Sequence, residues 1–254
     1  MSASLSIAVV GDYQRGKSTL VNCLLGCDAA KMGRGLSTTY ENRDYKLSEA
    51  VTIIDTPGFN ANGKDDGTAS SAIDKADVVA YVHESKALGE TCADVFKWAR
   101  DRGKQMLFVL NCRNFEKWSP DENADIIATI DAELENKNLK TIMVPINGRI
   151  VTPVNILWAR YGLGMMDAES GGDAKDIHKI RSYAENDLDI PVLEIPDDSL
   201  RAEMLRRSEF LPIRDFLRNL PLELFKHAVS NPQREIDRIV DRFAAELRRR
   251  WAAA

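Results

Sequence analysis

Short apolar runs recur along the first 160 residues, and stretches with helical spacing separate them. The apolar runs are rich in β-branched residues and lie at residues 5–10, 51–54, 78–82, 105–111 and 151–156. The helical stretches lie at residues 19–25, 91–101 and 120–136. Short β-branched runs predict buried strands, and their alternation with helices predicts parallel pairing. We therefore expect an α/β fold, with a mainly parallel, doubly wound sheet and helices on both faces.

A glycine-containing segment follows the first apolar run directly. Residues 11–18 read GDYQRGKS, and a helical pattern begins immediately after them. Glycines allow successive backbone N–H groups to surround phosphate oxygens, and the amino end of the helix adds its positive dipole. Strand, GxxxxGKS and helix together are the context that a phosphate-binding loop requires. The predicted loop residues are Gly11, Asp12, Tyr13, Gln14, Arg15, Gly16, Lys17, Ser18 and Thr19.

The chemistry of Lys17 and Ser18 suggests a role for each in phosphate and metal binding, and a second motif supplies two further candidates. Lys17 supplies a positive charge to the β and γ phosphates, and Ser18 offers its hydroxyl to Mg²⁺. The apolar run at residues 51–54 ends in the sequence DTPG, where Asp55 can hold Mg²⁺ through water. The backbone N–H of Gly58, the last residue of this motif, can contact a γ-phosphate.

A loop between the two motifs carries a further candidate for a contact with Mg²⁺. Residues 33–39 contain Thr38 and Thr39, and residues 45–47 then read as a short strand. A GTPase closes such a threonine over its Mg²⁺. One of the two threonines is therefore a candidate metal ligand.

In order and spacing, the GxxxxGKS, TT and DTPG segments resemble those of translation-factor-class (TRAFAC) P-loop GTPases, within which the Era-type and dynamin-type G domains are most similar. The resemblance covers residues 5–160 well and extends loosely to about 220. It implies a P-loop NTPase G domain that binds GTP with Mg²⁺ and hydrolyses it to GDP. It also implies two switch segments, about 31–41 and 56–72, whose order depends on the γ-phosphate. The metal ligands that it implies are Ser18, Asp55 through water, and Thr39 in preference to Thr38.

The base-reading motif departs from the family pattern. Where the family has NKxD after the next central strand, this chain has Asn111, Cys112, Arg113 and Asn114. Cysteine replaces the lysine whose stem stacks on the purine, and asparagine replaces the aspartate that accepts from guanine. Guanine preference is thereby weakened but not excluded. Arg113, Asn114 and Phe115 also resemble the Arg-Asp-aromatic element of the guanylate-binding and atlastin-like branch, again with asparagine in place of aspartate.

The last base-contacting loop follows the sixth strand in the family. Residues 141–146 and 151–156 are both candidates for that strand. The second run continues into a helical pattern, so we favour Asn155 as the base contact and keep Asn147 as the competitor.

The group that orients the attacking water is not evident. Ras-type enzymes place a glutamine after the DxxG glycine, whereas this chain has Phe59, which cannot orient water by hydrogen bonding. Gln14 and Arg15 are the local candidates, Gln14 as a water or partner contact and Arg15 as an arginine finger in cis. A partner, including a second copy of the chain, could equally supply the group. The catalytic residues we predict are therefore Lys17, Thr39, Gln14 and Arg15.

The alternating pattern ends near residue 160. We predict a G domain over residues 1–225, with a helical insertion at about 161–207 that includes a helix at 173–186. The final G-domain helix is expected at 211–220. Residues 226–254 predict an amphipathic C-terminal helix, which either packs on the G domain, begins a truncated helical bundle, or lies on a membrane surface.

Composition narrows the class of protein. Of the 254 residues, 44% are hydrophobic and 29% are charged, which is ordinary globular usage. The formal charge of −5 gives no indication of a nucleic-acid partner, and four cysteines do not form a disulfide framework. Without a signal segment or a long apolar stretch, a cytoplasmic location is expected.

The main prediction is a Mg²⁺-dependent GTPase that binds GTP and GDP and whose switches control a protein partner or a nucleotide-dependent homodimer. Two alternatives remain. Phe59, Cys112 and Asn114 favour a nucleotide-sensing binding module with weak hydrolysis or relaxed base specificity. The C-terminal helix leaves room for a dynamin-like, membrane-associated GTPase, although membrane binding has little support.

Overall fold

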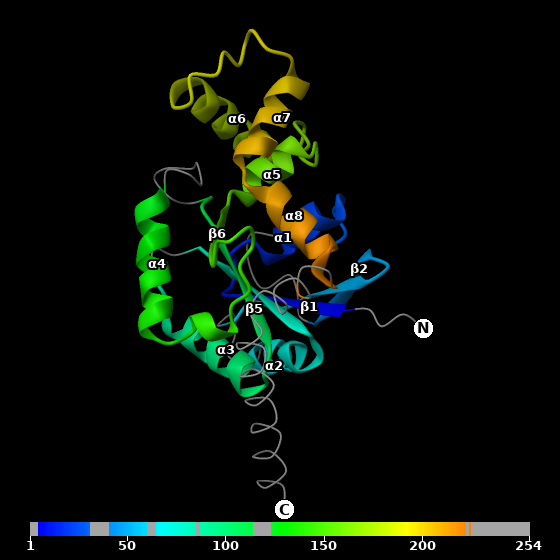
Figure 1. Cartoon of the computed structure of the whole chain (residues 1–254). Coiled ribbons are helices and arrows are strands. Elements are labelled where there is room, and N and C mark those ends of the chain that lie inside the picture. Colours follow the sequence, from blue (N-terminus) through cyan, green and yellow to red (C-terminus); the bar gives the residue numbers. More distant parts are fainter. Residues whose placement is uncertain are drawn as a thin grey trace, which may run out of the picture.

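A computed structural model of the chain describes residues 5–30, 41–59, 65–84, 87–113, 123–221 and 224 (Figure 1). Three of the predicted site residues, Thr38, Thr39 and Asn114, lie outside the described residues. The predicted C-terminal helix at 226–254 lies outside them too.

The core of the molecule is a six-stranded sheet with the order β2-β3-β1-β4-β5-β6. Its strands are β1 (Leu5–Val10), β2 (Arg43–Ser48), β3 (Val51–Asp55), β4 (Val78–His83), β5 (Gln105–Asn111) and β6 (Val151–Val154). Only the edge strand β2 runs antiparallel, and every other pair of neighbours is parallel. The central strands are apolar along nearly their whole length because helices cover both of their faces. The predicted mainly parallel, doubly wound sheet is confirmed.

The helices lie on both faces of this sheet, as expected. They are α1 (Lys17–Leu25), α2 (Asp65–Lys75), α3 (Glu90–Asp101), α4 (Ala124–Asn136), α5 (Ile156–Gly162), α6 (Gly171–Asn186), α7 (Asp197–Arg207) and α8 (Phe210–Arg218). Alternate residues of β1 enter different cores: Ile7 and Val9 pack with α1 and α8, whereas Ala8 and Val10 pack with α2, α3 and α4. This alternation follows from the two-residue period of a strand.

The structure decides between the two candidates for the sixth strand, because β6 lies in the second one. Residues 141–146 do not form a strand, and the chain there contains the 3₁₀ helix η2 (Lys140–Ile142) followed by single bridging residues. Met143 makes one parallel bridge to Met106, and the next backbone bond, from Val144 N–H to the Met106 carbonyl, continues the contact. The run is apolar because Met143, Val144 and Ile146 are buried against the sheet, so burial and not strand pairing explains its composition.

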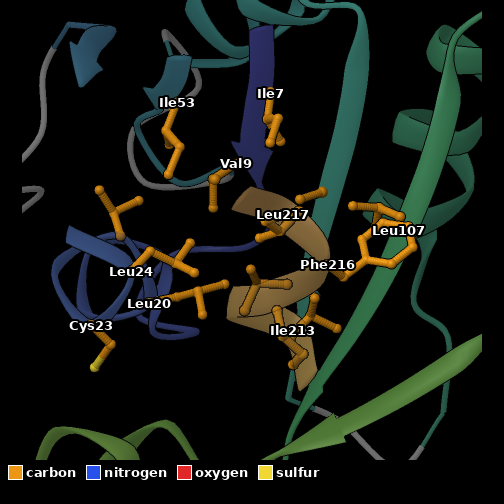
Figure 2. Close-up of a cluster of buried hydrophobic side chains, with 14 of the residues drawn as sticks. Ile7, Val9, Leu20, Cys23, Leu24, Ile53, Leu107, Ile213, Phe216 and Leu217 are labelled. Atoms are coloured by element: carbon orange, nitrogen blue, oxygen red, sulfur yellow. The ribbon is translucent and has the colours of Figure 1, made fainter. Parts of the chain in front are cut away.

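Helix α8 occupies the position of the predicted final helix of the G domain. Its apolar residues Phe210, Ile213, Phe216 and Leu217 are buried, at a spacing that keeps them on one face of a helix. Figure 2 shows Ile213, Phe216 and Leu217 beside Leu20 and Leu24 of α1 and facing the sheet. Helices α1 and α8 thus cover the same face of the sheet, although almost 200 residues separate them.

Helices α5, α6 and α7 form a group with a core of its own, seen in the upper part of Figure 1. Trp158 and Tyr161 of α5 lie in this core, and the Trp158 ring contacts the Tyr183 ring of α6 at a centroid distance of 5.6 Å. Helix α7 packs closely on α5, because a Cβ atom at Gly162 would lie 2.7 Å from the Arg201 carbonyl oxygen. The predicted stretch 161–207 therefore contains two helices, α6 and α7, which close over α5.

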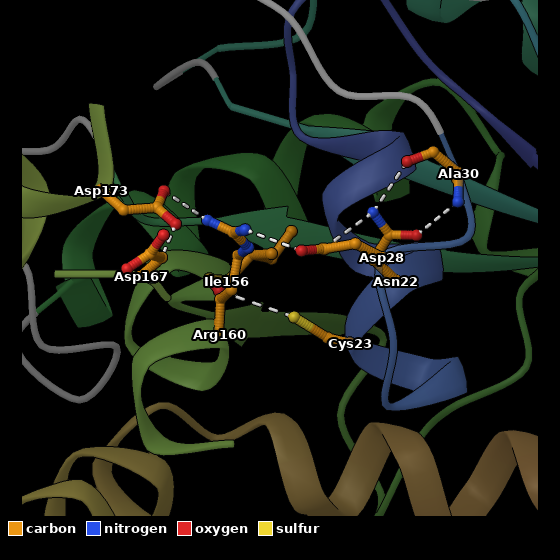
Figure 3. A network of polar contacts seen from close by, with 8 residues as sticks. All are labelled: Asn22, Cys23, Asp28, Ala30, Ile156, Arg160, Asp167 and Asp173. Carbon is orange, nitrogen blue, oxygen red and sulfur yellow. Dashed lines mark hydrogen bonds and ion pairs between the residues drawn. The ribbon is translucent and has the colours of Figure 1, made fainter. Parts of the chain in front are cut away.

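A polar network connects this helical group to the segment that follows α1 (Figure 3). The Arg160 guanidinium, on α5, donates to Asp173 Oδ1 of α6 at 2.7 Å and to Asp28 Oδ2 at 3.1 Å. In the same region Asn22 of α1 exchanges two hydrogen bonds with the backbone of Ala30, at 2.6 and 2.9 Å. Since Arg160 is buried, its two carboxylate partners offset the cost of removing its charge from water.

None of the helices in the described part of the chain has both the length and the apolar character that a membrane span requires.

Candidate nucleotide-binding site

The loop between β1 and α1 has a backbone that glycine makes possible. Gly11 and Gly16 have positive φ angles of 149° and 91°, and Gln14 adopts a left-handed conformation at 60°. A Cβ atom at Gly11 would lie 2.3 Å from the Val82 carbonyl oxygen, and one at Gly16 would lie 2.9 Å from Asn111 Nδ2. Both glycines are therefore required by the close approach of neighbouring strand ends as well as by φ.

Lys17, the first residue of α1, lies buried across this loop. Its Nζ atom donates a hydrogen bond to the Asp12 carbonyl oxygen at 2.8 Å. Burial lowers the pKa of the ammonium to about 8, and the charges of Asp55 and Asp12 oppose this effect. Gly58 adjoins the ammonium, because a Cβ atom at Gly58 would lie 3.0 Å from Nζ. The lysine of the first motif and the glycine of the second are thus neighbours.

Asp55 and Ser18 form the polar pair next to this lysine. Ser18 Oγ donates to Asp55 Oδ2 at 2.9 Å, and Asp55 is completely buried at the end of β3. Burial raises the pKa of Asp55 to about 6, against the opposing effects of the Ser18 hydrogen bond and the Lys17 charge. Among the described residues, none hydrogen-bonds to the other carboxylate oxygen, Oδ1.

These oxygens suit a magnesium ion. Mg²⁺ prefers oxygen ligands and is usually held by one or two side chains together with phosphate oxygens and water. The Ser18 hydroxyl lies beside the buried Asp55 carboxylate, whose Oδ1 atom accepts no hydrogen bond from the described residues, so the pair meets this requirement. The described residues contain no group of three His, Cys, Asp or Glu side chains that could hold a metal. Of the predicted metal ligands, Ser18 and Asp55 are the two that the structure describes.

Backbone hydrogen bonds join the DTPG segment to the loop. Tyr13 N–H donates to the Phe59 carbonyl at 3.2 Å, and Phe59 N–H donates to the Gly11 carbonyl at 3.3 Å. The Thr56 hydroxyl, whose role the sequence did not reveal, donates to the Val9 carbonyl at 2.8 Å. The two motifs are therefore held together before any ligand is considered.

The Phe59 side chain points into the core. It is buried among the residues packed on α2 and α3, and its ring lies 5.6 Å from the Trp98 ring. The expectation that this residue does not orient water thus has a structural reason, which is that the ring fills the core. Gln14 is exposed at the tip of the loop, while Arg15 and Thr19 are half-buried.

Asn111, at the end of β5, connects the glycine loop to the predicted base-reading segment. Its Nδ2 donates to the Arg15 carbonyl at 3.2 Å, and its Oδ1 accepts at 3.4 Å from the backbone N–H groups of both Arg113 and Ile156. One side chain thus contacts the loop, the predicted base-reading segment and the start of α5.

The family match agrees with this geometry. Residues 6–112 match the 50S ribosome-binding GTPase family. These residues belong to the translation-factor-class P-loop GTPases. The match ends at Cys112, directly after the asparagine that joins the two sides of the site.

Several relatives are similar to this GTPase domain. GTPase Der of Agrobacterium fabrum is 37% identical over 119 residues, which are 42% of this chain and 25% of that protein. GTPase Era of Pseudomonas savastanoi is 40% identical over 85 residues, which are 30% of this chain and 28% of that protein. A crystal structure of Era with MgGDPNP and a 16S ribosomal RNA segment matches 61% of this chain and 52% of its own, at 19% identity and a TM-score of 0.47. The chain spans about a quarter of the length of the first curated relatives it matches.

The structure separates the two asparagines considered for the last base-contacting loop of the GTPase domain. Asn155 follows β6 and is buried beside the Asn111 contact, where its Oδ1 accepts from Trp158 N–H at 3.1 Å and caps α5. Asn147 lies in an exposed turn before β6 begins, closed by the bridge between Ile146 and Arg149. Asn155 stays the prediction for this loop, and Asn147 stays its competitor.

The base side also contains a residue that sequence reasoning missed. Cys112 is fully buried, and burial raises the pKa of its thiol to about 12, so it offers no stem to stack on a base. Arg113 is instead 35% exposed in its side chain, and its Nε atom lies 3.9 Å from Oε1 of Glu84. Glu84 directly follows the β4 run, and a carboxylate in that position was the only signal in the sequence.

Proposed function

We propose that the chain binds GTP together with Mg²⁺ and hydrolyses it to GDP and phosphate. One observation carries the proposal: a buried ammonium and a buried carboxylate lie side by side at the glycine loop. Burial shifts the pKa of both groups toward the neutral form, and the opposing charges and hydrogen bonds around them do not offset it. A phosphate oxygen beside Lys17 and a cation beside Asp55 would satisfy both groups at once. The family match of residues 6–112 supports GTP as the ligand.

Each residue near the phosphates has a proposed task. Lys17 binds the β and γ phosphates, and the Gly58 N–H senses the γ-phosphate. Ser18 and Asp55 would hold Mg²⁺, which when bound would neutralise charge on the phosphates. Gln14 and Arg15, at the tip of the loop, are the candidates for contacts to the attacking water and to the transferring phosphoryl group.

Binding is tested by titrating the nucleotide-free chain with fluorescent GDP and competing with GTP, XTP and ATP, with and without Mg²⁺. We expect GTP and GDP to compete better than ATP, by less than an intact NKxD motif gives. Lys17→Ala should abolish binding, and Lys75→Ala, on the far end of α2, serves as the matched control. Preferential binding of ATP, or no binding of any purine nucleotide, contradicts the proposal.

Hydrolysis is tested by single-turnover measurement of phosphate release from GTP. Release should depend on Mg²⁺ and should disappear in Lys17→Ala purified in the same way, which excludes a contaminating hydrolase. Arg15→Ala and Gln14→Ala then show which loop side chain contributes, and a loss of about 10³-fold is expected for an arginine finger.

A second candidate function rests on the core position of Phe59 and on the burial of Cys112. With phenylalanine in place of the glutamine after Gly58 and cysteine in place of the lysine at position 112, the chain would act as a nucleotide-sensing module that hydrolyses slowly or accepts several purines. Hydrolysis no faster than in buffer, combined with micromolar or tighter GTP binding, would favour this candidate over the enzyme.

We further propose that the bound nucleotide controls association with a protein partner or with a second copy of the chain. The resemblance to switch GTPases supports this idea. Gel filtration with light scattering, in GDP, in a non-hydrolysable GTP analogue and in GDP with aluminium fluoride, tests for the homodimer. Co-sedimentation with anionic liposomes in the same states tests the dynamin-like alternative, which a monomer that ignores lipid in every state would eliminate.

A further inference from the structure

Glu84 is a buried carboxylate that the proposed mechanism does not use. The register of β4 against β5 pairs His83 with Leu110, so the next residues, Glu84 and Asn111, lie at the same carboxyl edge of the sheet. Only 5% of Glu84 is exposed. A carboxylate is seldom buried to this extent unless charges or hydrogen bonds compensate it.

The charges around Glu84 come from the two sides of the nucleotide site. Burial raises the pKa of Glu84, and the positive charges of Arg113 and then Arg15 oppose this rise. Arg113 belongs to the base-reading segment and its Nε lies 3.9 Å from Glu84 Oε1, while Arg15 belongs to the phosphate loop. Asn111 joins the same two segments through its hydrogen bonds to the Arg15 carbonyl and the Arg113 N–H.

Cysteine stands at position 112, where the family's motif has its lysine. Cys112 is buried, whereas Arg113 keeps about a third of its side chain exposed. Among the described residues of this segment, Arg113 can therefore present a flat, positively charged surface to a purine. A guanidinium stacks well on aromatic rings, but a free arginine loses several rotatable bonds when it does so. A fixed carboxylate beneath the guanidinium would reduce that loss.

We propose that Glu84 is a positioning residue for base recognition, which holds the Arg113 guanidinium against the purine ring. The proposal rests on the proposed function, since it concerns the same nucleotide site. A stacked guanidinium contacts the face of the purine ring and makes no hydrogen bond to the edge atoms that distinguish one purine from another. The contribution of this pair should therefore strengthen binding of every purine nucleotide, leave the preference for GTP over XTP unchanged, and be absent for a ligand that has no base.

The experiment measures dissociation constants of GDP, XDP and inorganic triphosphate for the full chain and for Glu84→Gln, Arg113→Ala and the double variant. We expect each single variant to weaken GDP and XDP about five- to tenfold and equally, which is the size of an arginine–ring contact. Triphosphate binding should change less than twofold. The double variant should lose no more than either single variant, because both act through one contact.

Three outcomes would overturn the proposal. If Glu84→Gln weakens triphosphate as much as GDP, then Glu84 acts on the phosphate loop through Arg15. If the losses of the two single variants add in the double variant, then Glu84 does not act through Arg113. If Arg113→Ala binds GDP like the unmodified chain, no stacking contact exists. Since Arg113 is partly exposed, Arg113→Ala should fold and tests the stacking contact. If Glu84→Gln does not fold, Glu84→Asp takes its place, and its loss for GDP should vanish in the Arg113→Ala background.

Failure of the underlying function looks different. If the unmodified chain binds neither GDP nor triphosphate, the nucleotide site itself is refuted. If it binds both and the variants leave all three constants unchanged, only the role of Glu84 is refuted.

Discussion

Gly58 offers a sharp test of the contact between the two phosphate-side motifs. A methyl group placed on Gly58 would lie 2.5 Å from the Cα and 2.8 Å from the N of Tyr13, and 3.0 Å from Lys17 Nζ. Ordinary carbon–carbon contacts lie at about 3.5–4.0 Å, so in Gly58→Ala the two segments must separate by about 1 Å. Since the obstructing atoms are backbone, no side-chain rotation can relieve the contact.

The cost can be worked out from the bonds that this separation breaks. Two backbone hydrogen bonds join the segments, between Tyr13 and Phe59 at 3.2 Å and between Phe59 and Gly11 at 3.3 Å. Both are already long, and a further ångström would take them beyond hydrogen-bonding range. At about 1 kcal/mol each, their loss and the residual strain should reduce the free energy of unfolding by about 2–3 kcal/mol. For a chain of this size the melting temperature should fall by roughly 5–10 °C.

The assay is thermal and urea unfolding of the nucleotide-free protein, followed by GTP and GDP titration. Gly67→Ala is the matched control, because Gly67 lies in α2 and nothing approaches its Cβ position within 4 Å. That substitution should leave stability unchanged or raise it by up to about 1 kcal/mol, since alanine favours helix. Equal losses in both variants, or no loss in Gly58→Ala, would refute the reasoning. GTP binding should weaken more than GDP binding if the Gly58 N–H senses the γ-phosphate.

Two further predictions concern buried charges. Arg160→Met leaves Asp28 and Asp173 without their shared cation, so urea unfolding should show a free energy of unfolding lower by about 2–3 kcal/mol. The control is Arg214→Met, whose partner Asp215 is 63% exposed, and it should change that free energy by less than ~0.5 kcal/mol. Equal effects of the two variants would contradict the role of burial. Burial in the folded protein raises the pKa of Asp55 from 3.8 to about 6, so the folded state favours the protonated carboxyl group. Protonation of Asp55 therefore stabilises the fold as the pH falls from 6 toward 4, and this stabilisation is lost as the pH rises through 6. Asp55 contributes at most about 3 kcal/mol to the change in stability between pH 4 and 7. Asp55→Asn should therefore flatten the dependence of the melting temperature on pH in this range. An unchanged slope would be evidence against the raised pKa of Asp55.

Local patterns were sufficient wherever the chemistry depends on neighbouring residues. The loop between β1 and α1 could be predicted because its glycines, its lysine and its serine are contiguous and lie between a β-branched run and a helix. The same holds for the end of β3, where the buried run is followed at once by Asp55. Helix α8 was predictable because its buried residues recur at helical spacing.

Other features depended on which strands are neighbours. The apolar run that contains Met143 and Val144 has the composition of a strand, but β6 pairs with β5 along its whole length. This run is therefore buried and, in the described structure, joins the sheet only through the single bridge from Met143 to Met106. Asn147 and Asn155 are equivalent by residue type, but Asn147 lies in an exposed turn and Asn155 is buried between β6 and α5. Hydrophobic periodicity carries no information on that difference.

The amino-acid sequence by itself determined the parallel α/β architecture and the phosphate-side residues, because strand propensity, helical spacing and loop conformation are properties of short contiguous segments. The tertiary structure alone decided what stands on the base side. The burial of Cys112, the hydrogen bonds of Asn111 to two separate segments and the approach of Glu84 to Arg113 all arise where the ends of β4, β5 and β6 meet the loop after β1. These residues are brought together by sheet pairing over long separations in the chain, and the free energy of that pairing comes from the whole core.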